Sequence, residues 1–306
     1  METNKTDYHV PVMLNECLDG LNIRPNGVYV DVTFGGGGHS RAIFERLNEE
    51  GKLIVFDQDP DARKNAWEAP NFHFIPANFQ FLGNHLKMLG ITQVDGILAD
   101  LGVSSHQFDQ FERGFSIRGE ARLDMRMNPL SEYSAETVVN TMEEFDLVAI
   151  FRKYGELSNA RKIAQYIVSA RSNQKIKTTQ QLMDILLPCA PKFKDHKFFA
   201  QVFQAIRIEV NQEMQVLEKF LEQTDKVLAD HGRLVVMSYH SLEDRLVKNY
   251  MKRGSLDGEI TKDFFGNVLK PFTEITRHPI VASEQEIELN SRSRSAKLRI
   301  SERNER

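Results

Sequence analysis

Residues 31–40 read DVTFGGGGHS, an acidic residue at the end of an apolar segment followed by four glycines. Ordering a run of glycines costs more backbone entropy than ordering other residues, so a simple turn gains little from it. Glycine does let a ligand approach the backbone closely, because it has no Cβ. The stretch therefore predicts a strand, turn and helix that hold a ligand, with an unliganded glycine turn as the alternative.

The residues that follow the glycines narrow the class of ligand. A phosphate-binding loop ends in Gly-Lys-Ser/Thr, whereas these glycines run into His-Ser. A dinucleotide fingerprint would need a third glycine at position 40, where serine stands. Sites for S-adenosylmethionine (SAM) have an acidic strand end and a turn like D-x-G-x-G-x-G. The stretch from Asp31 to Gly37 follows that pattern, with Thr33 in place of the first glycine.

Three further side chains follow the next apolar segments. Asp57 lies twenty residues after Gly37, where a carboxylate can accept hydrogen bonds from both ribose hydroxyls, and Asp59 is the expected cap of the next helix. Phe79 lies where a ring can stack on adenine, with core packing as the alternative. Asp100 ends the fourth segment, where it either faces the ligand crevice of an open α/β sheet or caps the following segment.

The first hundred residues alternate between short apolar segments rich in β-branched residues and helical segments. Such apolar runs are typical of parallel strands buried on both faces. We predict strands at residues 26–34, 51–57, 71–77 and 94–102, and helices at residues 40–50, 59–67 and 79–89. Alternating strands and helices predict a doubly wound α/β sheet.

The pattern changes between residues 105 and 211, where no convincing strand is found. Helical segments lie at residues 160–170, 179–187 and 198–211. Alternation then returns, with a helix at 213–230, a strand at 232–238, a helix at 242–253 and a half-buried strand at 296–300. We expect Ser241 and Asp244 to cap the helix at 242–253. The sequence therefore predicts a discontinuous sheet domain, residues 1–104 and 212–306, and a helical insertion of residues 105–211.

Charge is distributed unevenly along the chain. Its net charge is −4, but residues 152–207 contain eleven Lys or Arg against three acids, a net charge of +8. Residues 291–306 hold six more basic residues against two acids. A solvated helical face usually mixes the two signs, so the segments favour a surface that binds a polyanion.

Composition excludes several classes of protein. No apolar run approaches the roughly 18 residues that a membrane-spanning helix needs, and the first ten residues do not resemble an export signal. Cys17 and Cys189 stand alone, without the spacing of a disulfide framework or a zinc site, and are expected to be buried. We therefore expect a cytoplasmic protein that uses no metal.

Nine blocks of sequence together resemble the MraW/RsmH family, from about His9 to Arg299. These bacterial enzymes use SAM to methylate the exocyclic N4 amine of a cytidine, at position 1402, in 16S rRNA of the small ribosomal subunit. The blocks are HVPVMLNE (9–16), DVTFGGGGHS (31–40), DQDP (57–60), DGILADLGVSS (95–105), RGFS (113–116), LDMRM (123–127), QAIRIEVN (204–211), YHSLEDR (239–245) and SRSRSAKLR (291–299). One block departs from the family, because this chain reads YGEL at residues 154–157 where YGEE is usual.

The resemblance implies a class I SAM-dependent methyltransferase fold with a helical insertion, and the basic charge predicts that the insertion and the C-terminal tail contact the phosphates of the RNA. It implies that SAM contacts Gly37, Gly38, His39, Asp57, Phe79, Asp100 and Gln107, the last carried over only by its place after LGVSS. We expect Asp100 to act on the target amine. Candidate substrate contacts are Asp124, Arg126, His240 and Ser241, for which an ion pair and a helix cap are the alternatives.

Two other functions stay open. An NAD-dependent oxidoreductase shares the fold, but it would need the missing third glycine and would leave the basic insertion unexplained. A ribosome-assembly protein that binds RNA and has lost turnover is the second, although the acidic strand ends and the open glycine turn argue against it. The sequence does not decide whether the protein forms a homodimer.

Overall fold

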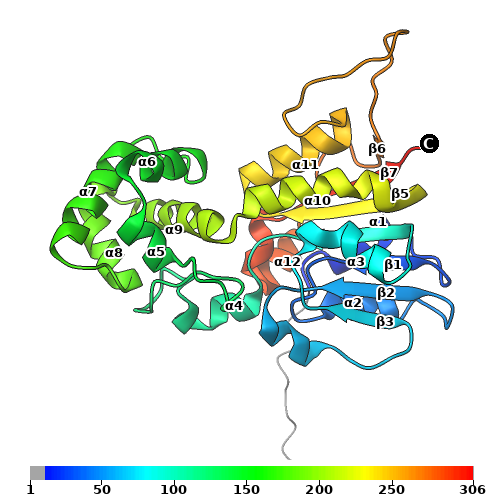
Figure 1. Ribbon diagram of the computed structural model, residues 1–306, viewed down its shortest axis with the longest axis horizontal. Helices are drawn as coiled ribbons and strands as arrows, with labels where there is room; N and C mark the ends of the chain where they lie inside the picture. Colours follow the sequence, from blue (N-terminus) through cyan, green and yellow to red (C-terminus); the bar gives the residue numbers. More distant parts are fainter. Residues whose placement is uncertain (1–10, 306) are drawn as a thin grey trace, which may run out of the picture. The chain divides into compact units, whose positions relative to one another are not determined.

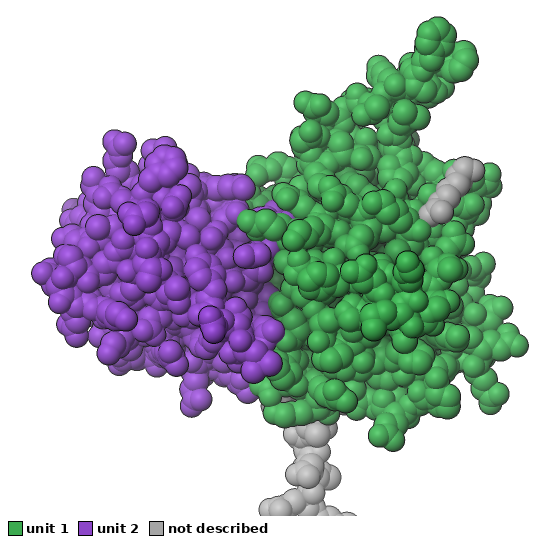
Figure 2. Space-filling view, in the orientation of Figure 1, with its two compact units in different colours: residues 1–102, 215–306 green, residues 103–214 purple. Residues whose placement is uncertain are grey.

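The computed structural model describes residues 11–305, apart from the side chains of Ser105 and His106. His9 and Val10, the first residues of the HVPVMLNE block, lie outside the described residues. The chain divides into two compact units, which Figure 2 shows in different colours. The sheet unit runs to Gly102 and resumes at Gln215, and the helical unit comprises Val103–Met214. The boundaries expected from the sequence, after residues 104 and 211, lie close to these positions.

A mixed sheet organises the first unit, and within the described residues it has seven strands (Figure 1). Their order is β3-β2-β1-β4-β5-β7-β6. The strands β1 to β5 pair in parallel, and β7 runs antiparallel to both of its neighbours. Their bounds are β1 Val28–Asp31, β2 Lys52–Phe56, β3 Phe72–Ile75, β4 Val94–Asp100, β5 Leu228–Ser238, β6 Phe272–Glu274 and β7 Lys297–Arg303. This topology confirms the predicted class I methyltransferase fold.

Helices cover the sheet because its central strands are apolar on both faces. In β5 the residues from Leu234 to Met237 are wholly buried, so side chains that point to opposite faces are both covered. The helix α1 packs on β4 and β5, and Gly20 lets it approach Val235 and Ile300 closely. The helices of this unit are α1 Leu14–Leu21, α2 Gly38–Phe44, α3 Leu82–Met88, α10 Glu213–Val227, α11 Ser241–Arg253 and α12 Glu284–Leu289.

The predicted cap of α11 is wrong by one residue. His240, not Ser241, is the N-cap, and its Nδ1 accepts a hydrogen bond from Glu243 N while the Glu243 side chain bonds back to His240 N. Glu243 is buried, so the capping pair that includes it is also protected from water. The capping box of α11 is therefore formed by His240 and Glu243, whereas Asp244 pairs with Arg299 of β7.

The helical unit, as the structure describes it, contains the three predicted helices and three helices that were not predicted. Its helices are α4 Ser105–Asp109, α5 Ala135–Thr141, α6 Glu144–Lys153, α7 Ala160–Asn173, α8 Thr179–Leu186 and α9 Asp195–Asn211. Of the predicted helices, α7 and α9 are three residues longer than predicted and α8 is one residue shorter. Capping boxes at Ser134 and Thr178 fix where α5 and α8 begin. Phe151, Ile163 and Ile206 are fully buried, so this unit has an apolar core of its own.

Two expectations from composition can be compared with the structure. Cys17 and Cys189 are both free and buried, as expected. Among the described residues, none of the helices combines the length and the apolar character that crossing a bilayer requires.

Candidate active site

The glycine stretch lies at the carboxyl edge of the sheet, between the ends of β2 and β4. After β1 ends, Val32 N donates to Leu98 O of β4 at 3.0 Å, and Phe34 N donates to Phe56 O of β2 at 2.9 Å. The order of the strands reverses between β1 and β4. Ligands of open α/β sheets bind at such a switch point, outside the carboxyl ends of the strands.

Asp31 and Thr33 fix the path of the chain as it leaves β1. Asp31 is 1% exposed and accepts hydrogen bonds from Thr33 N at 3.0 Å and from Ser40 Oγ at 2.6 Å. Burial raises the pKa of Asp31 above its usual value. Thr33 Oγ1 in turn accepts from Asp100 N at 2.7 Å, which joins the loop to the end of β4. The side chains of Asp31 and Thr33 therefore connect the end of β1 to α2 and to the end of β4 by hydrogen bonds.

The backbone geometry explains why glycine occupies several of these positions. Gly35 and Gly37 have φ of +50° and +77°, in the left-handed region that favours glycine. A Cβ at Gly38 would lie 2.4 Å from Pro11 Cγ, so this position also excludes a side chain. At Gly36, in contrast, a Cβ would meet nothing within 4 Å. The loop thus presents bare backbone with open space beside it.

Asp57 holds the glycine loop in place from the end of β2. Its Oδ2 accepts from Gly35 N and its Oδ1 from Asp59 N, both at 2.8 Å. Burial raises the pKa of Asp57 to about 6. Asp59 caps the next turn by accepting from Asp61 N, so the two acids have separate roles. Each oxygen of Asp57 keeps a second lone pair with which to accept a bond from a ligand hydroxyl.

Asp100 lies at the end of β4 between two side chains from distant parts of the sequence. Tyr239, which follows β5, donates its hydroxyl to Asp100 Oδ1 at 2.8 Å. His39 Nδ1 lies 3.9 Å from Asp100 Oδ2, beyond hydrogen-bond distance. Burial raises the pKa of Asp100 to about 6, and burial together with the Asp100 charge raises that of Tyr239. The carboxylate is therefore fixed by one oxygen, and its second oxygen faces His39.

His39 is anchored on its far side. The ring is 7% exposed, and Nε2 lies 3.0 Å from Val12 O. A carbonyl oxygen only accepts, so Nε2 carries the proton of that bond and Nδ1 is the atom toward Asp100. Thus His39, Asp100 and Tyr239 form one cluster at the carboxyl edge, in which Tyr239 was not predicted from the sequence. The only signal for it was its place in YHSLEDR, next to two residues that were singled out.

Phe79 and Gln107 stand in different surroundings. Phe79 is half-buried, and its ring packs edge-on against the buried Phe220, with 5.3 Å between centroids. The ring therefore rests on the core at the end of β3. Gln107 belongs to the helical unit, where its side-chain oxygen accepts from Ser104 N at 3.1 Å.

The candidate substrate contacts are engaged within their own units. Arg126 forms a two-pronged ion pair with Asp124, at 2.7 and 2.6 Å, and also donates to Pro129 O at 2.9 Å. The pair holds the pKa of Asp124 below its usual value despite partial burial. His240 caps α11, and Ser241 is an exposed first residue of that helix. The ion pair and the cap that the sequence offered as alternatives are thus both present.

The residues at this edge fit SAM, which has a cationic methionine part and a ribose. A bare backbone loop between two carboxylates suits the close approach of a ligand with positive charge. Asp57, at the end of the strand after the loop, has lone pairs for two neighbouring hydroxyls. The phenyl ring of Phe79 is backed by Phe220 and partly open, as a stacking surface for a flat base must be.

Comparison with known proteins agrees with this fit. Residues 6–304 match the model of the MraW methylase family. The chain is 54% identical to a Ribosomal RNA small subunit methyltransferase H of Bacteroides fragilis, over 99% of this chain and all of that protein. It is 56% identical to the Flavobacterium psychrophilum protein of the same name, over 95% of this chain and all of that protein.

Solved structures give a more distant likeness. A putative rRNA-methylase from Clostridium thermocellum shares 12% identity at a TM-score of 0.45, covering 96% of this chain and 98% of that one. That likeness says nothing about individual residues of the site. The match of the family model over almost the whole chain and the high identity to full-length relatives do decide its membership. This chain belongs to the MraW methylase family and is a SAM-dependent methyltransferase.

Proposed function

We propose that this protein methylates the exocyclic N4 amine of a cytidine in 16S rRNA of the small ribosomal subunit. The observation that supports this most is the cluster at the end of β4. There a half-buried carboxylate, Asp100, is held by Tyr239 beside the glycine loop, so an acceptor for amine hydrogens lies next to the cofactor loop. The relatives named as small-subunit rRNA methyltransferases support the choice of RNA.

We infer that SAM is held by Gly37, Gly38, His39, Asp57, Phe79, Asp100 and Gln107. When bound, SAM would supply a methyl group on a positively charged sulfur. The amine can attack this methyl carbon directly, and the sulfur then leaves as a neutral thioether. Asp57 would bind the ribose, and Phe79 would stack on the adenine. The protein's main contribution is then to position the two reactants, which needs no metal and no covalent bond to the enzyme.

Asp100 would make the target amine a better nucleophile. The lone pair of the cytosine amine is delocalised into the ring, so an acceptor near its hydrogens makes that pair more available. With a pKa of about 6, Asp100 is mostly ionised at neutral pH and can accept such a bond. Tyr239 occupies Oδ1, which leaves Oδ2 as the oxygen to receive the amine hydrogen. Methylation makes the amine cationic, and it then readily loses a proton.

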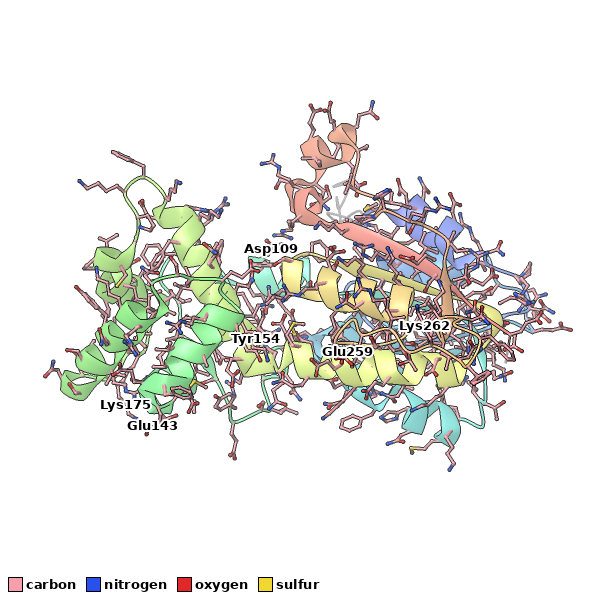
Figure 3. The ribbon with its side chains drawn as sticks, turned by 90° about the horizontal axis from the view of Figure 1, so that it is seen from above. Asp109, Glu143, Tyr154, Lys175, Glu259 and Lys262 are labelled. Atoms are coloured by element: carbon pink, nitrogen blue, oxygen red, sulfur yellow. The ribbon has the colours of Figure 1, made fainter. Side chains whose placement is uncertain are left out.

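The helical unit would bind the RNA around the target base. Its basic segment contains exposed lysines in two loops, Lys175 and Lys177 between α7 and α8, and Lys192 and Lys194 before α9 (Figure 3 labels Lys175). Exposed lysines with few acidic neighbours neutralise phosphates and release counterions. The target base must leave its stacked or paired position before it can reach the carboxylate of Asp100. An enzyme of this kind works where ribosomes are, in the cytoplasm.

Mass mapping of modified cytidines tests the proposal. 16S rRNA is compared from cells with and without this protein, and the purified protein is then added to unmodified small subunits with SAM. We expect one cytidine to carry a methyl group on N4 only when the protein is present. If the protein binds the subunits but no methyl group appears, the alternative of a ribosome-assembly protein without turnover is the correct one.

A further inference from the structure

One exposed aromatic side chain of the helical unit stands among lysines. Phe193 lies in the loop between the short 3-10 helix Leu187–Cys189 and α9, and it is 99% exposed. Every residue from 191 to 197 is exposed, and this stretch, which covers the end of the loop and the first three residues of α9, reads PKFKDHK. Three lysines therefore surround the ring in sequence, Lys192, Lys194 and Lys197, against one acid, Asp195. An apolar ring is thus presented to solvent inside a positively charged loop.

The backbone gives no reason for a phenylalanine here. Lys194 N donates to Pro191 O at 3.1 Å and closes a four-residue turn, in which Phe193 is the third residue. Its φ is +61°, in the left-handed region, where glycine or asparagine is favoured at that position of a turn. This conformation destabilises the turn when the residue is bulky, and a ring that is 99% exposed gains no stabilisation from burial. Strain without a packing benefit points to a function for the side chain.

A polar hollow lies beside the loop. Its volume is about 290 Å³, and its lining includes Lys194, Lys197, Ser158 and Asn159, together with one carboxylate, that of Glu156. Asn159 is the N-cap of α7, and its side chain donates to Cys189 O instead of capping the helix. The two ammonium groups outnumber the one carboxylate, so the lining has a net positive charge and suits a sugar-phosphate chain more than an apolar ligand.

We propose that Phe193 stacks on an unpaired base of the RNA substrate, while Lys192, Lys194 and Lys197 contact the phosphates on either side of that base. Proteins that bind single-stranded nucleic acid combine aromatic rings with a basic surface in this way, and every base offers a flat face. Unpaired RNA can turn a base outward, whereas a duplex keeps its bases stacked inside. The inference rests on the proposed function, because it assigns the RNA contact of that same enzyme.

A second exposed phenylalanine of the helical unit provides the comparison. Phe145 in α6 is 81% exposed, but its neighbours in the chain are Glu144 and Asp146. Exposure is therefore similar at Phe193 and Phe145, and the sign of the surrounding charge is opposite. A ring among carboxylates repels a phosphate chain, so Phe145 serves as the matched control.

The test measures the affinity of the full-length protein for a fluorescein-labelled single-stranded segment of 16S rRNA that includes the target cytidine, and for the same segment in a duplex. We expect F193A to weaken single-strand binding about fivefold or more, and F193W to bind as wild type does. F145A should leave both affinities unchanged. F193G should lose affinity as F193A does, yet melt at or above the wild-type temperature, because glycine relieves the strained turn.

Three results would overturn the inference. The first is an F193A variant that binds single-stranded RNA as tightly as wild type does. The second is an F193A variant that loses as much affinity for the duplex as for the single strand, because stacking on an unpaired base would then not explain the loss. The third is a loss of affinity for intact small subunits with none for free RNA, which would make a ribosomal protein the partner. Wild-type methylation of 16S rRNA is measured in parallel, so that a failure of the proposed function is seen separately.

Discussion

The carboxyl edge of the sheet and the basic loops of the helical unit hold their functional side chains in opposite ways. At the edge, Asp31, Asp57 and Asp100 are each fixed by hydrogen bonds to backbone or side chains. In the helical unit, Lys175 and Lys192 reach into solvent. A small cofactor needs atoms held in one place, whereas a long polyanion is bound by charges that adjust to it. Substitutions at the two places should therefore separate cofactor binding from RNA binding.

Replacing Asp100 by Asn should affect the edge most strongly. The amide keeps the shape of the side chain but loses the charge that accepts the amine hydrogen, so methylation at saturating SAM and RNA should slow about a hundredfold or more. Asp257→Asn, at an exposed acid of the sheet unit, is the control and should change little. If Asp100→Asn methylates at the normal rate and binds SAM normally, Asp100 has no catalytic part.

Reversing the charge of four lysines should affect only RNA binding. We expect affinity for 16S rRNA to fall about a hundredfold near 0.1 M salt, and the slope of log affinity against log salt to decrease by roughly 3, because fewer counterions are released. The changes to Glu are at Lys175, Lys177, Lys192 and Lys194. A charge-matched control changes four exposed lysines of the sheet unit, Lys52, Lys87, Lys248 and Lys252. An unchanged salt slope in the first variant would exclude this cluster from RNA binding.

Acidification should weaken SAM binding about tenfold for each carboxyl between pH 7 and pH 5. The pKa values of Asp57 and Asp100 are raised to about 6, and a cationic ligand favours their ionised forms, so affinity falls as pH falls through 6. Calorimetric titration at several pH values measures this, and Asp57→Asn should remove its share.

The stability of the cofactor-free protein should change in the other direction. Because the folded state holds these protons more tightly than the unfolded chain, their contribution is present below about pH 4 and is lost as pH rises through about 6. Urea unfolding across this range checks the sign. Stability and cofactor affinity rising together with pH would show that the two carboxyls are not protonated as described.

Alanine at Gly37 should give the smallest of these effects. Its φ of +77° is strained for any other residue, so the free energy of unfolding should fall by about 1–2 kcal/mol, and the shifted loop should bind SAM less well. Gly36→Ala is the matched control, because a Cβ there has open space. Equal stability of the two variants in urea unfolding would mean that the loop relaxes without cost.

The sequence predicted the sheet well because its strands are marked locally. Apolar runs such as 94–102 end in polar residues or glycine, and β4 begins at Val94 as predicted but ends at Asp100, two residues before the predicted end. The bond from Tyr239 to Asp100 could not be predicted, since 139 residues separate the two and no periodic pattern relates them. The prediction of the N-cap of α11 was wrong for another reason. His240, Ser241, Glu243 and Asp244 lie within five residues there, and which pair forms the capping box depends on where the buried strand before it ends.

The neighbours β4 and β5 lie side by side, with Asp100 opposite Met237, although the whole helical unit separates them in the chain. During synthesis, β1 to β4 emerge first, and β4 has no β5 to pair with until more than a hundred further residues have been made. The helical unit has its own buried core and can form in that interval. Tyr239 and β7 come later still, so the cluster at Asp100 is among the last parts of the molecule to be assembled. The order of the chain thus delays the candidate site at the carboxyl edge until the residues of the helical unit have been made.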